Sequence, residues 1–313
     1  MNIKKGLLTI GLASVLAIVS ACGSEERVDE TEPFFVGEAV QEREQSFSYT
    51  HIHGMSINPE DPNKIFLASH DGLIEYNKQS GEAYYVGSKK FDLMGFSQVA
   101  DSKYLMTSGH PEPGSSLEDP LGFMWSEDLG ETWEVRSFYE MIDFHALTST
   151  QSQGKLLSYA IDNNDHFIFA STDKGYSWEV VKTNGLPLEP DEFFDLAIAP
   201  NNDDVVYAAT SSGLMYSENG GVDWSRKVEG FITALNVVSD DEVIFYEASQ
   251  SGLYRLKGEE FITYDLYLQT DAANYIAMNE ASSKVIVATF QNNLYETTDH
   301  GENWELLVEE GSF

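Results

Sequence analysis

Cysteine is nearly absent from this chain of 313 residues, in which Cys22 is the only one. A single thiol excludes an intramolecular disulfide, so the fold depends on burying a core. Helical patterning is absent too, because no stretch shows an amphipathic period of useful length. Short alternating runs separated by Gly, Asn and Asp turns take its place, and they predict an all-β protein.

Positive charge is also scarce. The chain has 18 Lys and Arg residues against 52 Asp and Glu residues, which gives a formal charge of −34. A surface of this sign repels nucleic acid and anionic lipid head groups, so we expect no nucleic-acid partner. The acidic residues are scattered through turns and strand ends, which favours a solvated surface on an exported protein. Weak binding of calcium or another hard cation is the alternative.

The N-terminus predicts where the protein resides. Lys4 and Lys5 precede an apolar run from Gly6 to Ala21, which ends in small residues directly before Cys22. The run is too short, and too interrupted by polar residues, for a transmembrane helix. This pattern is typical of a bacterial lipobox. We therefore predict a signal peptide over residues 1–21, a lipid on Cys22, and anchoring to the outer face of a bacterial membrane.

One eight-residue pattern, Ser/Thr-x-Asp/Asn-x-Gly-x-x-Trp, occurs four times. Its copies are Ser126–Trp133, Ser171–Trp178, Ser217–Trp224 and Thr297–Trp304. The first three start 45 and 46 residues apart, and the gap of 80 before the last leaves room for one degenerate copy near residues 257–259. A period of about 40 to 50 residues with strand-like flanks predicts a propeller or an array.

Each residue type of this octapeptide suits a tight hairpin. The Asp or Asn side chain bonds back to backbone N–H groups, the Gly supplies a positive φ, and the Trp begins the returning strand and packs beneath the turn. We therefore expect a structural role for Asp128, Gly130, Trp133, Asp173, Gly175, Trp178, Asn219, Gly221, Trp224, Asp299, Gly301 and Trp304.

Six repeats can be counted from their second strands, which we expect at Lys64–Ser69, Lys103–Ser108, Lys155–Ile161, Val205–Thr210, Glu242–Ala248 and Lys284–Thr289. The prediction is a monomeric β-propeller of six four-stranded blades over residues 47–313, whose radial repetition protects the strand edges. Residues 22–46 are polar and acidic and form a tether, although Phe34–Val40 could add an outer strand to the first or last blade. Seven blades result if the segment from Phe34 to Phe47 pairs with more of the chain.

Chemistry is expected on the face opposite the octapeptide turns, where the innermost strands start. Aligning these strands places one residue of each at an equivalent position: His53, Met94, His145, Asp195, Thr233 and Tyr275, with His51, Asp92, Asp143 and Phe193 two residues earlier. The loops after two second strands add His70 and His110. Five of the seven histidines, at positions 51, 53, 70, 110 and 145, then lie at one end of blades one to three.

Imidazoles beside carboxylates suit a transition metal ion, zinc or copper first. The metal hypothesis uses His51, His53 and one or more of the other three histidines, with Asp143 or Asp195 as a further ligand. Two alternatives remain: the histidines hydrogen-bond within a polar channel lining, or they act as acids, bases or substrate-orienting groups without metal. The proline-rich loop from His110 to Gly122 lies beside them and suits a lid.

The octapeptide resembles the Asp-box, or BNR, repeat of sialidases, sortilin-type receptors and photosystem II assembly propellers. Together with the lipobox and the segments His51–Gly54, Ser69–Leu73 and Ser108–Pro111, it is similar to a group of exported bacterial lipoproteins labelled glycosyl hydrolases or BNR-repeat proteins. This resemblance implies a propeller fold and carries little information about catalysis.

The sequence argues against sialidase activity, because a sialidase binds its substrate with three arginines that converge from inner strands. The five arginines of this chain, at 27, 43, 136, 226 and 255, fall in the tether, on outer strands or on a third strand. Another glycosidase needs only paired carboxylates, for which the candidates are Asp92, Asp143, Asp195 and Glu247. Three functions therefore stay open: binding of a metal, small ligand or partner protein at the histidine face, glycoside hydrolysis there, and a protein-assembly scaffold using the acidic faces.

Overall fold

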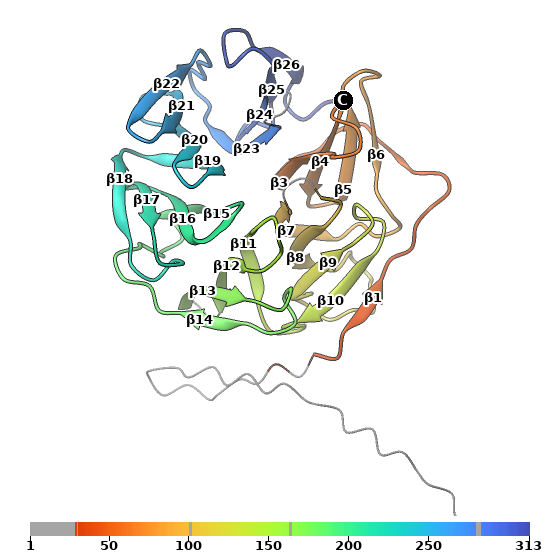
Figure 1. Cartoon of the computed structure of the whole chain (residues 1–313). Helices are drawn as coiled ribbons and strands as arrows, with labels where there is room; N and C mark the ends of the chain where they lie inside the picture. Colours follow the sequence, from red (N-terminus) through yellow and green to blue (C-terminus); the bar gives the residue numbers. More distant parts are fainter. Residues whose placement is uncertain (1–28, 30, 100–101, 163–164, 280–282) are drawn as a thin grey trace, which may run out of the picture.

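Six antiparallel sheets follow one another along the chain and are arranged radially around a central axis (Figure 1). The computed structural model describes residues 29, 31–99, 102–162, 165–279 and 283–313. Within these ranges the chain is all-β, so the predicted six-bladed propeller is confirmed and a seventh blade is not formed. No helix in the described ranges is long and apolar enough to span a membrane. The predicted signal peptide and Cys22 lie outside the described residues.

Each blade consists of four consecutive strands, the first of them innermost. Blade one contains β3 (Ile52–Ile57), β4 (Lys64–Ser69), β5 (Gly72–Asn77) and β6 (Glu82–Tyr85), and blade two contains β7 (Asp92–Gln98), β8 (Leu105–His110), β9 (Phe123–Ser126) and β10 (Trp133–Ser137). Blade three contains β11 (Asp143–Ser149), β12 (Leu156–Asp162), β13 (Asp165–Ser171) and β14 (Glu179–Val181), and blade four contains β15 (Phe193–Ala199), β16 (Asn202–Thr210), β17 (Gly213–Ser217) and β18 (Ser225–Glu229). Blade five contains β19 (Ile232–Ser239), β20 (Glu242–Glu247), β21 (Gly252–Lys257) and β22 (Glu260–Tyr264), and blade six contains β23 (Ala273–Asn279), β24 (Lys284–Thr289), β25 (Leu294–Thr297) and β26 (Glu305–Val308).

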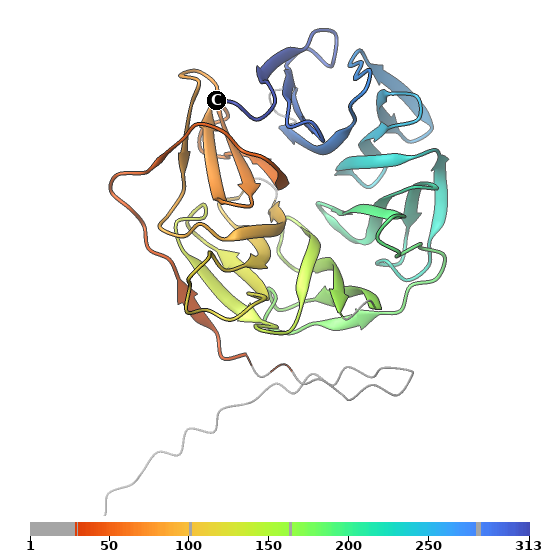
Figure 2. The same cartoon turned by 180° about the vertical axis from the view of Figure 1, so that it is seen from behind.

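The segment that we expected to be a tether adds two edge strands along the outer rim (Figure 2). β1 (Phe34–Val36) pairs with β10, and β2 (Gln45–Ser46) pairs with β6. The expectation that Phe34–Val40 joins the first or last blade was therefore wrong, because this segment lies on the second blade. The edge of β10 offers unpaired backbone groups there, and the Phe34 ring packs edge-on against Tyr139 at 5.1 Å. Charge fixes the segment further, since Arg43 bonds to Glu75 and Glu131 on blades one and two.

The ring closes without a blade shared between the two ends of the chain, since blade six consists only of β23 to β26. Short backbone pairing joins the ends instead: the Tyr49 N–H donates to the Gly311 carbonyl at 2.8 Å, and the Phe313 N–H donates to the Phe47 carbonyl at 3.0 Å. The Phe313 ring stacks on Tyr76 of blade one, with centroids 5.3 Å apart. A hydrophobic cluster shared by the two blades, with Ile65 and Leu67 on one side and Ile286 and Leu294 on the other, completes the closure.

All four octapeptides form the same hydrogen-bonded turn. In the second copy, the Ser171 hydroxyl donates to Asp173 Oδ1 at 2.8 Å and accepts from the Gly175 N–H at 2.9 Å. The residue before the tryptophan donates its N–H to Asp173 Oδ1 at 2.9 Å. Trp178 is buried, and its Nε1 donates to the Gly175 carbonyl at 3.2 Å. A Cβ on Gly175, where φ is +81°, would lie 2.1 Å from the Phe123 ring of the preceding blade. The turn therefore also packs one blade against the next.

Candidate functional site

Every innermost strand carries a β-bulge near its start. The extra residue is His53 in β3, His145 in β11, Phe194 in β15, Thr233 in β19 and Asn274 in β23, and in β7 the bulge lies between Met94 and Ser97. A bulge leaves one residue outside the ladder and re-aims its side chain. Sequence spacing alone could not detect the bulges, since it assumes regular strands.

The bulges correct our alignment of the innermost strands. Asp195 and Tyr275 follow the extra residue of their strands, whereas His53 and His145 are the extra residues themselves. These four residues are therefore not equivalent, although all four line the same cavity. Phe194 occupies the position in blade four that we had assigned to Asp195. The regular spacing that we assumed for the strand misses Phe194 by one residue.

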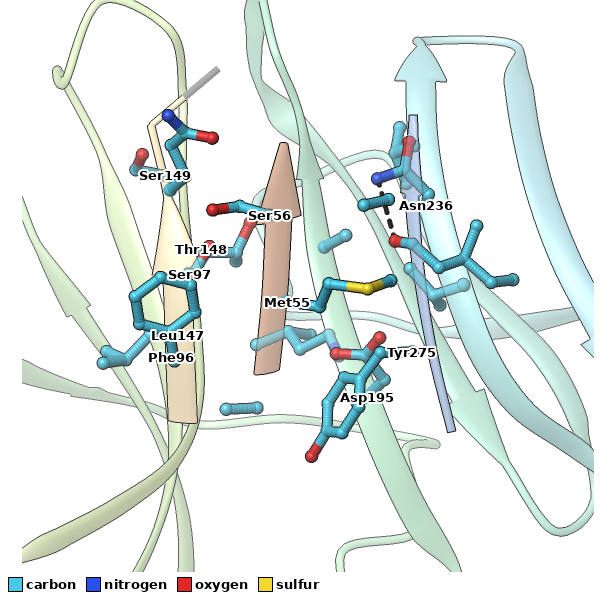
Figure 3. Close-up of a pocket in the computed structure, with 18 of the residues that line it drawn as sticks. Met55, Ser56, Phe96, Ser97, Leu147, Thr148, Ser149, Asp195, Asn236 and Tyr275 are labelled. Atoms are coloured by element: carbon cyan, nitrogen blue, oxygen red, sulfur yellow. Dashed lines mark hydrogen bonds between the residues drawn. The ribbon is translucent and has the colours of Figure 1, made fainter. Parts of the chain in front are cut away.

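The innermost strands enclose a cavity of about 340 Å³ along the axis, lined by residues of all six blades (Figure 3). Its titratable lining residues are His53, His145, Asp195 and Tyr275. None of the described residues that line it is a lysine or an arginine. All four titratable groups come from the starts of their strands, so they lie toward the end of the channel where the histidines gather.

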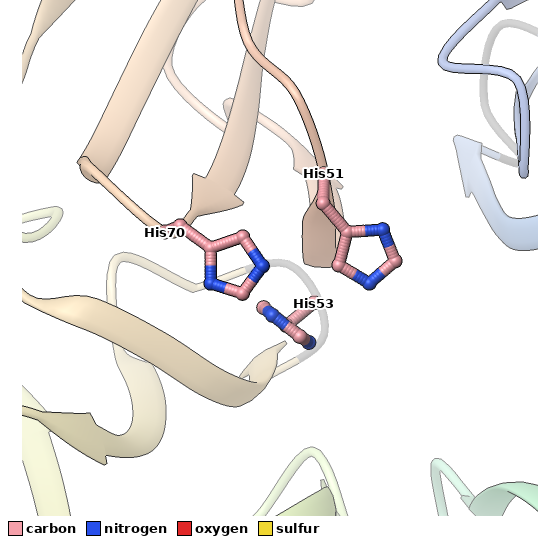
Figure 4. A group of neighbouring side chains, drawn as sticks. All are labelled: His51, His53 and His70. Atoms are coloured by element: carbon pink, nitrogen blue, oxygen red, sulfur yellow. The ribbon is translucent and has the colours of Figure 1, made fainter.

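Three histidines converge at this mouth (Figure 4). His51 directly precedes β3, His53 lies in β3, and His70 follows β4 in the tight turn to β5. Each offers one ring nitrogen within 4.8 Å of the others. The ring centroids lie 4.6 Å apart for His51 and His53, 4.7 Å for His53 and His70, and 5.4 Å for His51 and His70. We call these three residues the histidine triad.

Asp92, at the start of the second blade, orients the triad. Its Oδ1 lies 2.8 Å from His70 Nδ1 and 3.8 Å from His53 Nε2. Because a carboxylate oxygen accepts hydrogen bonds, Nδ1 of His70 acts as the donor to Asp92, and Nε2 is the ring nitrogen available to a metal ion. This carboxylate–imidazole arrangement is the one that commonly supports metal-binding histidines.

Burial keeps the other two triad members neutral. It lowers the pKa of His53 to about 3, with the neighbouring His51 and His70 adding to the effect. Burial and then His70 also lower the pKa of His51. His53 Nε2 is buried without a hydrogen-bond partner among the described residues. Neutral imidazoles are the form in which histidine binds metal ions.

The remaining two histidines form a separate group with carboxylates. His145 Nε2 lies 3.2 Å from Asp143 Oδ2. His110 lies between two carboxylates: its Nε2 is 3.6 Å from Asp143 Oδ2, and its Nδ1 is 2.6 Å from Asp119 Oδ1. The hydrogen bond with Asp143 first, and that with Asp119, raise the pKa of His110 to about 9. Burial raises the pKa of Asp143, but the hydrogen bond from His110 and the charge of His145 lower it on balance. His110 is therefore a cation at neutral pH, and the predicted five-histidine cluster divides into two groups.

The carboxylates considered for glycoside hydrolysis are mostly engaged by other groups. Asp92 and Asp143 bond to histidines. The buried Glu247 accepts hydrogen bonds from the backbone N–H groups of Phe231, Ser249 and Gln250, at 3.0, 3.3 and 2.6 Å. The carboxylate of Glu247 thus stabilises a loop, and sequence spacing could not distinguish it from a catalytic carboxylate. Of the four candidates, only Asp195 lines the cavity.

Asp195 stands apart in its environment. Burial raises its pKa to about 7, although hydrogen bonds from the backbone N–H groups of Leu196 and Leu235 favour the ionised form. Burial, and then the charge of Asp195, raise the pKa of Tyr275 on the sixth blade. The two side chains lie beside each other in Figure 3. They form a pair of titratable groups, from blades four and six, within the channel.

The loop that we expected to act as a lid is fixed at several points. Besides the bond between Asp119 and His110, the Glu118 N–H donates to the Tyr139 hydroxyl at 2.6 Å, and Lys89 pairs with Glu112 at 3.0 Å. These contacts hold the loop against blade two and against the end of β10. The loop lies beside the histidines, as expected, through the bond between Asp119 and His110.

No protein-family model matches the sequence, and no curated protein sequence matches it significantly. Many solved structures share the fold. A GH74 xyloglucanase from Xanthomonas campestris matches with a TM-score of 0.55 and 12% identity, over 88% of this chain and 47% of that one. A chain of a nidogen–laminin complex matches with a TM-score of 0.59 and 8% identity, over 80% and 95%. An oligogalacturonate lyase from Vibrio parahaemolyticus matches with a TM-score of 0.54 and 10% identity, over 89% of this chain and 85% of that one.

These likenesses establish the propeller fold and nothing finer, because identities near one in ten carry no information on the site. The chain also spans only about half the length of the xyloglucanase that it matches. The matched proteins include a xyloglucanase, a lyase and a chain of the nidogen–laminin complex, so the fold leaves enzymatic and binding functions equally open. Function has to be argued from the channel mouth.

Proposed function

We propose that this protein binds a divalent transition-metal ion, zinc or copper, at His51, His53 and His70. The observation that carries the proposal is the convergence of three imidazoles from two separate chain segments, with ligand nitrogens within 4.8 Å of one another. Nitrogens that share one zinc ion lie about 3.3 Å apart, at Zn–N distances of about 2.0–2.1 Å. Small rotations of the side chains therefore suffice to close the site.

Three protein ligands leave a coordination position open, as in sites that bind an exchangeable molecule. His53 belongs to the triad and also lines the axial cavity, so this position is adjacent to the channel. The His70 side chain is 44% exposed, which gives an ion access from solvent. Asp92 would hold the tautomer and orientation of His70. A ligand site of this kind supports metal handling or ligand binding better than a closed structural site.

The metal content of the purified protein, prepared without a histidine tag, tests this proposal. We expect near-stoichiometric zinc or copper by plasma mass spectrometry, and its loss in a His51→Ala/His53→Ala variant. The matched control is His300→Ala, because His300 is exposed in an octapeptide turn away from the mouth. Asp92→Asn should weaken metal binding by about 10- to 100-fold. Absence of metal from every variant after reconstitution, or equal metal in the double variant, refutes the site.

We further propose that the propeller is an exported Asp-box lipoprotein, attached through Cys22 to the outer face of a bacterial membrane. The apolar run before a solitary cysteine supports this. The structure adds that the chain reaches the propeller along its outer rim, away from the channel axis (Figure 1). Cys22→Ser should move the protein from the membrane fraction to the soluble fraction of cells. Unchanged fractionation would contradict lipid anchoring.

A further inference from the structure

Asp195 is the only carboxylate among the described residues that line the axial cavity, and no lysine or arginine accompanies it. Its Oδ1 accepts the Leu196 N–H at 2.8 Å. The other titratable lining groups are His53, His145 and Tyr275. A carboxylate in such surroundings is costly to ionise unless a cation pairs with it. The cavity therefore contains an acidic group for which the described lining residues supply no lysine or arginine as counter-ion.

Aromatic and thioether side chains line the same cavity as this carboxylate. Figure 3 shows Asp195 beside the Tyr275 ring and the Met55 side chain. Phe194, the extra residue of the adjoining bulge, also lines the cavity and contacts the half-exposed Phe231 ring edge-on at 5.2 Å. A carboxylate among aromatic faces is the combination that binds ammonium groups, through ion pairing and cation–π attraction. Neutral sugars depend instead on several converging hydrogen bonds.

We propose that the channel is a binding site for a small organic cation, whose ammonium group pairs with Asp195 while its carbon skeleton packs against Met55, Phe194 and Tyr275. A volume of about 340 Å³ lies at the lower end of ligand pockets, which span about 300–1,000 Å³, and so limits the ligand to a small amine. The formal charge of −34 attracts cations toward the protein from a distance. This site is distinct from the histidine triad, of which only His53 lines the cavity.

Calorimetric titration with benzylammonium tests the proposal, with benzyl alcohol as its neutral counterpart of nearly equal shape. We expect one benzylammonium per protein and at least about tenfold weaker binding of the alcohol, since the buried charge pair is lost. Asp195→Asn should also weaken benzylammonium by at least about tenfold and abolish the preference over the alcohol. The matched control is Asp191→Asn, which removes an exposed carboxylate four residues earlier and should leave the affinity unchanged.

Two further variants make the result decisive. Tyr275→Phe keeps the ring and should retain most of the affinity, whereas Tyr275→Leu should lower it several-fold. His70→Ala removes a triad member that does not line the cavity, so it should abolish metal binding and leave benzylammonium binding intact. The proposal is overturned if benzylammonium does not bind, if the alcohol or glucose binds as tightly, or if folded Asp195→Asn retains the affinity. Loss of binding in both Asp195→Asn and Asp191→Asn would show attraction by the overall surface charge only, and would also overturn it.

Discussion

Replacing Asp195 by asparagine should stabilise the protein, and more so at high pH. The carboxyl group has an ordinary pKa of 3.8 and a pKa of about 7 in the folded channel. Below pH 4 it is protonated in both folded and unfolded chains, so it costs the native state nothing. As the pH rises above 3.8, the carboxyl group ionises in the unfolded chain but stays protonated in the folded protein until about pH 7, so the unfolded state gains the advantage. Stability is therefore present at low pH and lost across the window from about pH 4 to pH 7.

The size of the effect follows from the same pKa shift. One pKa unit corresponds to about 1.4 kcal/mol, so a rise of roughly three units costs about 4 kcal/mol above pH 7. This is an upper bound, because the side chain is only partly buried against the channel and some water reaches it. Asparagine has a similar shape, and its side-chain oxygen can still accept the Leu196 N–H. The variant should therefore retain the fold without the ionisation cost.

Urea unfolding of both proteins in amine-free buffers, from pH 4 to pH 8, measures this difference. We expect nearly equal unfolding free energies at pH 4 and a variant that is more stable by up to about 4 kcal/mol at pH 8. Asp191→Asn controls for the loss of one negative charge from the whole protein. A stability difference that is the same at every pH, or that favours the wild type at pH 8, would refute the assignment of a raised pKa to Asp195.

Three other outcomes follow from the contacts. Glu296→Gln leaves the buried Lys284 ammonium, 3.2 Å away, without its carboxylate, so thermal unfolding should show a loss of about 3–5 kcal/mol; no loss would mean that the pair does not stabilise blade six. Gly175→Ala should cost several kcal/mol in urea unfolding, whereas Gly114→Ala, with a similar φ but nothing within 4 Å, should cost about 1 kcal/mol, and equal costs would contradict the packing argument. By NMR titration, His110 should lose its proton near pH 9, with its stabilising ion pairs complete below pH 6.5 and lost as the pH rises through 9; an ordinary midpoint would contradict the pairing.

The fold could be predicted because it repeats. Four octapeptides in register and six second strands reveal the blade number, since each blade is a local hairpin series that repeats the same pattern. The gathering of His51, His53 and His70 could be predicted as well, because the start of a strand and the turn after its hairpin partner lie at the same end. Both inferences depend only on antiparallel pairing between neighbours in sequence.

The remaining features depend on contacts that are irregular or distant in sequence. The bulges shift Asp195 by one position relative to His53, and no local signal marks an extra residue within a strand. The pairing of Phe34–Val36 with β10 joins residues about 100 positions apart, so a tether could not be distinguished from an edge strand. Glu247 looks like a catalytic candidate until its three backbone partners are known. Such hydrogen-bond partners cannot be predicted from the amino-acid composition.

In five of the innermost strands, the bulge separates the residues that pair in the sheet from one residue that differs from blade to blade. An extra residue in a bulge takes no part in the ladder, so its side chain is not constrained by strand pairing. Blades one, three, four, five and six use five positions of this kind for histidine, histidine, phenylalanine, threonine and asparagine. One backbone irregularity, repeated around an axis, can thus carry different chemistries without a change in the sheets. A propeller built in this way could acquire a new ligand by substitution at the channel mouth while its blades stay as they are.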